Sequence, residues 1–290
     1  MNFTHGSDLL QLCQSQNKKI YEVCIEREME LTKASREEII NKMKYSLEIM
    51  KNSIERSLTE DIKSVGGLIG GEAKLVRNRL SSNKSVCGSL MSKAISAAMG
   101  VLEVNASMGL IVAAPTAGSC GILPAGVITV AQEYGLSDED MLNAIFTAAA
   151  VGIIITRNAT VAGAEGGCQA ETGSAAAMTA AGIVEMMGGT PQEALHAASM
   201  ALNNVMGLVC DPIAGLVEAP CQTRNSIGVA NALISAEMAL SGVVSVIPFD
   251  EVVEAMYKVG KSLPYELRET ALGGVAATCT GCALTKKIFG

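Results

Sequence analysis

Charge divides the chain near residue 80, and this division limits what each part can fold into. Residues 1–80 contain 13 Lys or Arg and 12 Asp or Glu, whereas the remaining 210 residues contain only 26 charged side chains. The second part is rich in Ala, Gly, Val, Ile, Leu and Met, and only 3% of the chain is aromatic. Such small aliphatic side chains favour closely packed helices and give little strand signal. We therefore predict an all-α fold, with a compact bundle of mostly buried helices over residues 81–290 and a charged amphipathic helical extension over residues 1–80.

Short signals predict where individual helices begin. A Ser or Thr followed three residues later by an acidic residue forms a capping box, which is typical of a helix N-terminus. Three such boxes are candidate helix starts: Ser35 with Glu38, Ser137 with Asp140, and Thr190 with Glu193. The helices that follow the last two boxes should reach about Ile155 and Cys210. The prediction is completed by helical segments over residues 9–31 and 90–105, a loop over residues 115–126, and a helix capped by Asp250 and stopped by Gly260.

The charge balance and the N-terminus narrow the cellular setting and the partners. The net charge is -7 and no cluster of Lys and Arg is visible, so we expect no nucleic-acid partner. The first residues lack the basic and apolar regions of an export signal. Nine cysteines without such a signal indicate a reducing, cytoplasmic compartment, in which thiols stay free or bind metal.

A membrane-spanning bundle of small-residue helices is an alternative, because the mean hydropathy is +0.33. The longest run without charge, residues 104–132, contains two prolines and several polar side chains and is a poor spanning sequence. The next run, residues 144–155, has 12 residues, whereas a spanning helix needs ~20. No Trp or Tyr belt marks an interface, so we expect no membrane partner.

Three cysteines in separate settings are the strongest candidates for chemistry. Cys168 follows a Gly-Gly pair, Cys210 precedes Asp-Pro, and Cys221 directly follows a proline. Such neighbours place a thiol at a bend or a helix end, where thiolates from distant segments can converge. Three sulfur ligands leave one position of a metal centre free for substrate. The alternatives are a buried apolar role for each cysteine, a structural zinc site, or a cysteine-based redox module.

A series of linked motifs extends this interpretation. They are Glu103-x-Asn105-Ala106, Val112-x-Ala114-Pro115-Thr116-x-Gly118, Gly121-Ile122-x-Pro124-Ala125, Arg157-Asn158-Ala159, Gly163-Ala164-Glu165-x-Gly167-Cys168-Gln169, Cys210-Asp211-Pro212-x-Ala214-Gly215, Pro220-Cys221-x-x-Arg224-Asn225, Met256-Tyr257-x-x-Gly260-Lys261 and Arg268-Glu269-Thr270-x-x-Gly273-Gly274. In this order and spacing, residues 95–282 resemble the iron-sulfur-dependent L-serine dehydratases. Some members of that family are single chains with an additional N-terminal domain, which is missing here. The chain is therefore similar to the α chain of the two-chain form, which implies a separate β chain and a hetero-oligomer.

The resemblance implies a cofactor and a reaction. Cys168, Cys210 and Cys221 would hold a four-iron, four-sulfur (4Fe-4S) cluster whose fourth iron is open to substrate. The implied enzyme is a carbon-nitrogen lyase that converts L-serine to pyruvate and ammonia. An iron Lewis acid suits the loss of a β-hydroxide, which is a poor leaving group. In some relatives a C-terminal cysteine occupies the open iron in the resting enzyme. Cys279 and Cys282 form a CxxC motif near the C-terminus, and Cys282 matches the position of that cysteine.

Substrate-binding residues are predicted with their alternatives left open. Thr116, Gly118 and Ser119 lie in a polar loop that could donate to the substrate carboxylate or bind its ammonium group; the alternative is an ordinary turn between helices. Arg157 and Arg224, each followed by Asn, suit a carboxylate because a guanidinium binds it bidentately. Both arginines could instead pair with a buried acid, for which the candidates are Glu165, Glu171 and Asp211.

The general base has no candidate in this sequence. Only two histidines, His5 and His196, are present, and neither lies near a recognisable motif. We therefore expect the β chain to supply the base, or a histidine that positions it.

A pyridoxal-phosphate lyase could catalyse the same reaction and is the main alternative. Lys93 could form a Schiff base, and the glycine run over residues 66–71 could bind a phosphate. That cofactor usually sits in an α/β fold, and the sequence shows no alternation of strands and helices.

Overall fold

The computed structural model describes residues 2–82 and 84–290. Throughout these two ranges the chain forms helices joined by loops, without a strand, which confirms the predicted all-α fold. The α-helices are α1 (Gly6–Gln16), α2 (Ile20–Thr32), α3 (Arg36–Thr59), α4 (Glu72–Arg79), α5 (Gly88–Ala106), α6 (Ile122–Tyr134), α7 (Asp138–Asn158), α8 (Gly163–Gly166), α9 (Ser174–Met186), α10 (Pro191–Asn203), α11 (Cys221–Leu240), α12 (Phe249–Ser262) and α13 (Cys279–Phe289). The boxes of Ser35, Ser137 and Thr190 begin α3, α7 and α10 as predicted, because each hydroxyl accepts the N–H of the acidic residue three positions later.

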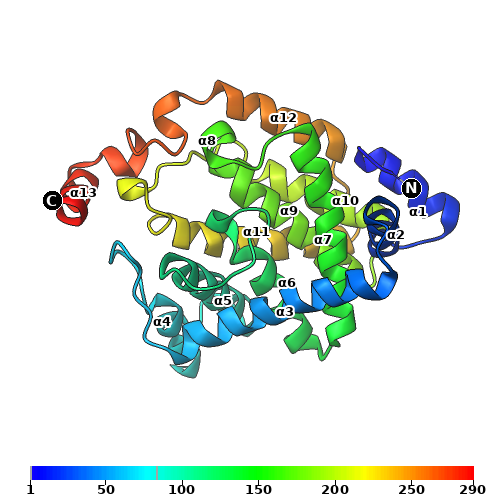
Figure 1. Ribbon diagram of the computed structural model, residues 1–290, viewed down its shortest axis with the longest axis horizontal. Helices are drawn as coiled ribbons and strands as arrows, with labels where there is room; N and C mark the ends of the chain where they lie inside the picture. Colours follow the sequence, from blue (N-terminus) through cyan, green and yellow to red (C-terminus); the bar gives the residue numbers. More distant parts are fainter. Residues whose placement is uncertain (1, 83) are drawn as a thin grey trace.

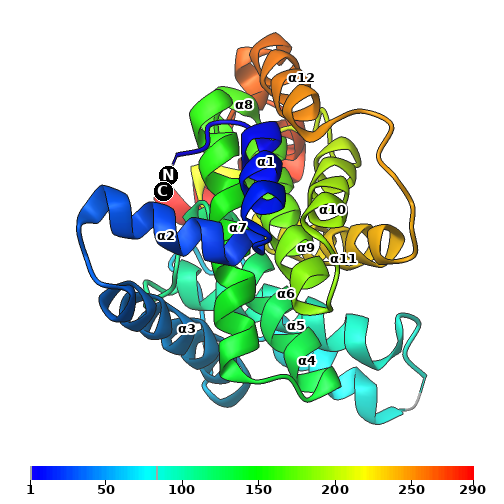
Figure 2. The ribbon, with the colours of Figure 1, turned by 90° about the vertical axis from the view of Figure 1, so that its right-hand side faces the viewer.

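The helices pack around α9, which contacts α6, α7, α10 and α11. Figure 1 shows α9 near the middle of the molecule, with α3 crossing one face and α4 and α5 next to it. The first and last helices, α1 and α13, lie at opposite ends of the long axis (Figure 1). Viewed along that axis, α7 and α9 lie side by side in the interior (Figure 2). The most apolar helices therefore form the centre, and the charged N-terminal helices cover it.

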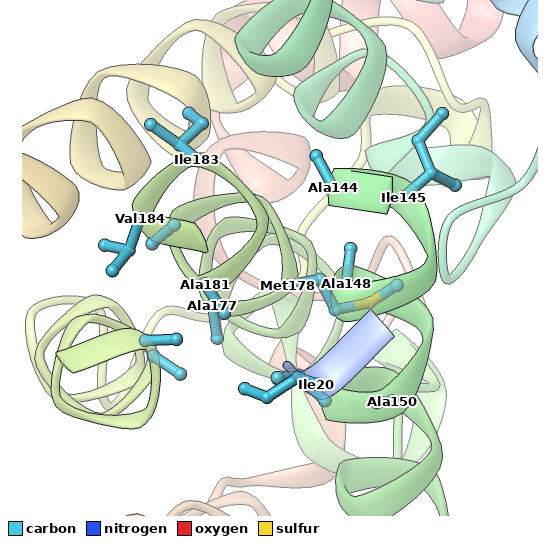
Figure 3. Close-up of a cluster of buried hydrophobic side chains, with 14 of the residues drawn as sticks. Ile20, Ala144, Ile145, Ala148, Ala150, Ala177, Met178, Ala181, Ile183 and Val184 are labelled. Carbon is cyan, nitrogen blue, oxygen red and sulfur yellow. The ribbon is translucent and has the colours of Figure 1, made fainter. Parts of the chain in front are cut away.

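Small residues allow α7 and α9 to approach closely. Figure 3 shows Ala148 of α7 beside Met178 of α9, with Ile20 of α2 next to both helices. A Cβ built at Gly182 of α9 would lie 2.6 Å from Ala144 O. Because no side chain fits at that distance, the glycine is required for this helix contact.

The N-terminal helix α2 is anchored on α9 by a buried carboxylate. Glu185 accepts the N–H groups of Ile20 and Tyr21 (2.7 and 3.2 Å) and the hydroxyl of Thr147. Burial raises the pKa of this carboxyl, and the hydrogen bonds partly oppose the rise. Glu185 thereby satisfies the first turn of α2, while a boundary between an extension and a body near residue 80 stays a prediction.

Two predictions, one for the N-terminal helix and one for the helix near Asp250, are wrong. The helix expected over residues 9–31 is interrupted at Asn17, whose φ of 52° lies in the left-handed region, so α1 and α2 are separate helices. α12 begins one residue before Asp250, so this residue does not cap its own helix. Its carboxylate instead accepts the N–H groups of Gly6 and Ser7 (2.6 and 3.1 Å) and caps α1 from a distant part of the sequence.

Two other predicted boundaries are also wrong. The loop expected over residues 115–126 is shorter, because α6 begins at Ile122 and holds Pro124 in its first turn, where a proline needs no N–H partner. The helix α10 ends at Asn203 and does not reach Cys210. Because α10 ends early, the chain between Asn203 and Cys210 is not helical and can turn back toward the start of α9.

Among the described helices, α7 alone is long and apolar enough to cross a membrane by length and composition. Its apolar stretch has a mean hydropathy of 1.4, and 67% of it is buried inside the protein. The first turn of α7 is acidic. These features are those of the central helix of a packed core.

Candidate functional site

Two of the three cysteines singled out above lie next to the start of a helix, and the third lies in extended chain. Cys168 sits between α8 and the π-helical turn η3 (Gln169–Gly173), which continues directly into α9. Cys210 lies in extended chain after α10 and pairs with Arg268 in an isolated parallel bridge. Cys221 is the first residue of α11. All three thiols are buried. The prediction of a bend or helix end holds for Cys168 and Cys221 but is wrong for Cys210, because its backbone is held extended by the bridge to Arg268.

One guanidinium connects two of the segments that carry these cysteines. Arg224 lies one turn after Cys221 on α11. Its Nη2 donates to Asp211 Oδ1 (2.5 Å), and its Nη1 donates to the backbone carbonyl just before Cys210 (2.8 Å). Burial raises the pKa of the Cys168 thiol, and the positive charge of Arg224 acts to lower it. Because both members of the ion pair are largely buried, these contacts hold the segments of Cys210 and Cys221 in a fixed relation.

The three thiols influence one another electrostatically. Burial is the main cause that raises the pKa of each thiol, to about 12 for Cys221. The negative charge of Cys168 further raises the pKa values of Cys210 and Cys221. Arg224 opposes the rise at Cys168 and Cys221. Thiols in this setting stay protonated until a bound metal displaces their protons.

The donor set is chemically suited to an iron-sulfur cluster. Thiolates are soft ligands that select such clusters or zinc. Within residues 2–82 and 84–290, no three or more His, Cys, Asp or Glu side chains are drawn together for one metal ion. A 4Fe-4S cluster binds each cysteine through a different iron, so its ligands stand farther apart than those of a single ion. Gly163 leaves room among the donors, because a Cβ there would lie 2.9 Å from Cys210 Sγ.

The loop with Thr116, Gly118 and Ser119 lies beside this centre. Thr116 Oγ1 donates to Glu171 Oε1 (2.7 Å) and lies 3.1 Å from Ser119 Oγ. The carbonyl of Gly118 accepts from Asn225 Nδ2 on the first turns of α11 (2.8 Å). The structure therefore brings the three loop residues together with the cysteine-bearing ends of α9 and α11.

Glu171 joins the loop to the thiols, and the sequence suggested it only as an alternative partner for the arginines. Its Oε1 accepts from Thr116, and its Oε2 lies 3.8 Å from Cys210 Sγ. Burial raises the pKa of this carboxyl, and the negative charge of Glu269 adds to the rise. Its position three residues after Cys168, in the helical turn that starts there, is the signal that could have identified it.

The remaining candidate residues have other surroundings. Arg224 pairs with Asp211, which is the alternative considered for it above. Arg157 is exposed in the last turn of α7, and no hydrogen bond or ion pair in the described part of the chain joins it to the loop or the thiols. Cys282 is exposed on α13, where its Sγ lies 3.9 Å from Ala276 O.

The segment before α13 runs along Cys210. The N–H of Cys210 donates to Leu267 O (2.9 Å), and its carbonyl accepts from Glu269 N (2.7 Å). Val275 N donates to Asp211 Oδ2 (2.6 Å). The C-terminal segment is thus attached to the centre ahead of Cys282, whose role as a ligand stays a prediction.

The two histidines lie elsewhere. His5 caps α1 together with Asp8, at the end of the molecule opposite α13 (Figure 1). His196 lies on α10, where its ring is 3.2 Å from Gln192 and lines a small cavity with Phe249. Burial lowers the pKa of His196. Neither ring is in contact with the thiols or with the loop.

The glycine run considered as a phosphate loop binds a carboxylate of this chain instead. Ser64 Oγ, Gly66 N and Leu68 N donate to the carboxylate of Glu218 (2.6, 2.6 and 3.0 Å). A phosphate would need these same donors. The structure therefore gives no support to a pyridoxal-phosphate site in this run.

Together these features define the class of the protein: an all-α body that gathers three buried thiols and a carboxylate beside a hydroxyl-bearing loop, an arrangement suited to a thiol-ligated metal centre. The model of the family described as "Serine dehydratase alpha chain" matches residues 15–276, so the chain belongs to that family.

Similar proteins agree with this assignment. The chain is 46% identical over 288 residues to the probable L-serine dehydratase, alpha chain, of Bacillus subtilis (strain 168), covering 99% of this chain and 96% of that protein. It is 48% identical over 274 residues to the L-serine dehydratase, alpha chain, of Peptoniphilus asaccharolyticus, covering 94% of each. It is 33% identical over 287 residues to L-serine dehydratase 2 of Escherichia coli (strain K12), covering 97% of this chain but only 62% of that longer protein.

Proposed function

We propose that the chain is the catalytic α chain of an L-serine dehydratase, which converts L-serine to pyruvate and ammonia. The observation that carries the proposal is the Arg224 network, because it joins the segments of Cys210 and Cys221 and places a positive charge that acts on the thiol of Cys168. The names of the two α-chain relatives, 46% and 48% identical, support the same activity.

We propose a 4Fe-4S cluster on the three buried cysteines, with Cys282 as a further candidate ligand. When bound, the cluster supplies a Lewis-acidic iron that assists the departure of the substrate's hydroxyl group. The chain itself contributes the burial that keeps bulk water from the thiolates. Arg224 contributes a positive charge beside Cys168, and its pairing with Asp211 keeps the neighbouring Cys210 in position.

Thr116, Gly118 and Ser119 are proposed to bind the polar groups of L-serine. The first and third provide hydroxyls, and that of Thr116 donates to Glu171, which contacts the thiol of Cys210. Gly118 leaves the backbone accessible, since a Cβ there would lie 3.0 Å from Glu171 Oε1. Arg224 is engaged by Asp211, so its proposed role is to organise the thiols rather than to bind the substrate carboxylate.

A substrate-binding role for Arg157 rests on the family resemblance alone. Its side chain is exposed at the end of α7. An exposed arginine can still meet a carboxylate of a partner chain or of an incoming substrate. The proposal for this residue is therefore independent of the contacts around Glu171.

The general base is proposed to come from a β chain. The only two histidines of this chain, His5 and His196, lie away from the thiols. The printed names of the two relatives, "alpha chain", imply a separate β chain for those proteins. We therefore propose a cytoplasmic αβ hetero-oligomer as the active enzyme.

Anaerobic purification followed by mixing with β chain tests the proposal. The α chain should contain about four irons and four acid-labile sulfides per molecule, with a broad brown absorbance. The mixture should form pyruvate from L-serine, and the α chain alone should not. Zinc in place of iron and sulfide, or a sharp yellow Schiff-base band, would refute the cluster. Full activity from the α chain alone would refute the base from a β chain.

A further inference from the structure

Glu171 differs from the two structural carboxylates described above. Glu185 and Glu218 each accept two backbone N–H groups and one hydroxyl. Glu171 accepts one hydroxyl, from Thr116, and a weak contact from the Cys210 thiol, and it receives no backbone N–H in the described part of the chain. Its oxygens therefore retain acceptor capacity that the protein does not use.

Glu171 is partly accessible where the loop of Thr116 lies against it. The other four residues of η3 are buried, whereas Glu171 is only partly buried. Two glycines line the carboxylate: a Cβ at Gly163 would lie 2.6 Å from Oε2, and one at Gly118 would lie 3.0 Å from Oε1. Because a Cβ does not fit at these distances, only glycine backbone can lie this close to the carboxylate, and no side chain at either position covers it.

The charge of Glu171 lacks a cation. Among the described residues it forms no salt bridge, and Arg224, the basic side chain that influences it, is paired with Asp211. A partly buried negative charge without a partner is unfavourable, and a cationic ligand would relieve it.

We propose that Glu171 binds the α-ammonium group of the amino-acid substrate, an assignment that rests on the dehydratase activity proposed above. An amino acid such as L-serine carries one cation, its ammonium group. Thr116 orients the carboxylate by donating to Oε1, and Oε2 faces the thiol of Cys210. An ammonium group held there places the rest of the substrate between the loop and the thiols. The site therefore selects amino acids over hydroxy acids of the same shape.

The test replaces Glu171 by Gln, which removes the charge and keeps the shape, in the αβ enzyme with its cluster loaded. The KM for L-serine should rise about tenfold to hundredfold, as expected for the loss of a hydrogen bond between charged groups. Inhibition by L-alanine, which keeps the ammonium group, should weaken by a similar factor. Inhibition by 3-hydroxypropanoate, which is serine without its amino group, should change less than about threefold. Binding of both inhibitors is also measured directly, from the change that they cause in the cluster absorbance.

Glu165→Gln is the matched control, because it makes the same charge change at an exposed position of the neighbouring helix α8. It should leave KM and both inhibition constants unchanged. If the wild-type enzyme forms no pyruvate from L-serine, the proposed function fails. If the wild type is active and Glu171→Gln binds L-alanine and 3-hydroxypropanoate with equal loss, or with none, the assignment of Glu171 is wrong. Loss of iron and sulfide from both Glu171→Gln and Glu171→Asp would also overturn it, because the carboxylate would then be part of the metal site.

Discussion

The ion pair between Arg224 and Asp211 is predicted to stabilise the whole site, and replacing Arg224 with alanine tests this. The two side chains are only 12% and 3% exposed, and their atoms approach to 2.5 Å. Removing one partner of a buried pair destabilises a protein by about 3–5 kcal/mol, because the other charge stays buried without compensation. Asp211 would keep one hydrogen bond, from Val275 N at 2.6 Å. We therefore expect Arg224→Ala to lower the free energy of unfolding by an amount near the lower end of this range, about 3 kcal/mol.

Urea unfolding of the cluster-free α chain, followed by circular dichroism, measures this loss. With a slope of about 3 kcal/mol per molar urea, a loss of about 3 kcal/mol lowers the midpoint by about 1 M. Arg224→Lys keeps a positive charge but not the planar fork, so it should recover part of the loss. Lys258→Ala is the control, because this lysine is 71% exposed and pairs only with exposed Glu254. Its midpoint should equal that of the wild type.

The reasoning is refuted if Arg224→Ala shifts the midpoint no further than Lys258→Ala does. A double-mutant cycle with Asp211→Asn separates the pair from the other contacts of Arg224. A coupling energy near zero would show that the guanidinium acts through its remaining hydrogen bonds. In that case the ion pair would not be what holds the cysteine segments together.

Three further predictions concern other parts of the structure. Iron and sulfide binding and pyruvate formation should each be abolished by Cys168→Ala, Cys210→Ala or Cys221→Ala. The control Cys13→Ala, at a buried thiol of α1, should keep both properties. Brown colour retained in any of the first three variants would show that ligand to be misassigned. Gly182→Ala should lower the free energy of unfolding by about 1–3 kcal/mol, since the methyl group must displace the α7 backbone; an unchanged urea midpoint would contradict the close contact. Burial raises the folded-state pKa of Glu185 above its ordinary value of 4.5, so this group favours folding below pH 4.5 and loses that contribution as the pH rises through the raised pKa. Relative to Glu185→Gln, the wild-type midpoint should fall over that pH range, and parallel profiles would disprove the shift.

Local signals predicted much of the framework correctly. The boxes at Ser35, Ser137 and Thr190 begin helices because a side chain and an N–H three residues apart meet whatever the rest of the chain does. Asn17 shows the limit of such signals, because a single residue in the left-handed region ends a helix without interrupting its apolar pattern. Asp250 shows a second limit, since its carboxylate caps a helix that lies at the other end of the sequence.

The sequence by itself determined the helical class, the three thiols and the loop that belongs with them, because composition, capping and motif order act within short segments. Only the tertiary structure decided which groups meet. It paired Arg224 with Asp211 and placed Glu171 between Thr116 and Cys210. Contacts of this kind join residues that are far apart in the chain, and they depend on how the helices pack around α9. No local pattern encodes that packing, so the charge balance of the site became visible only in the folded protein.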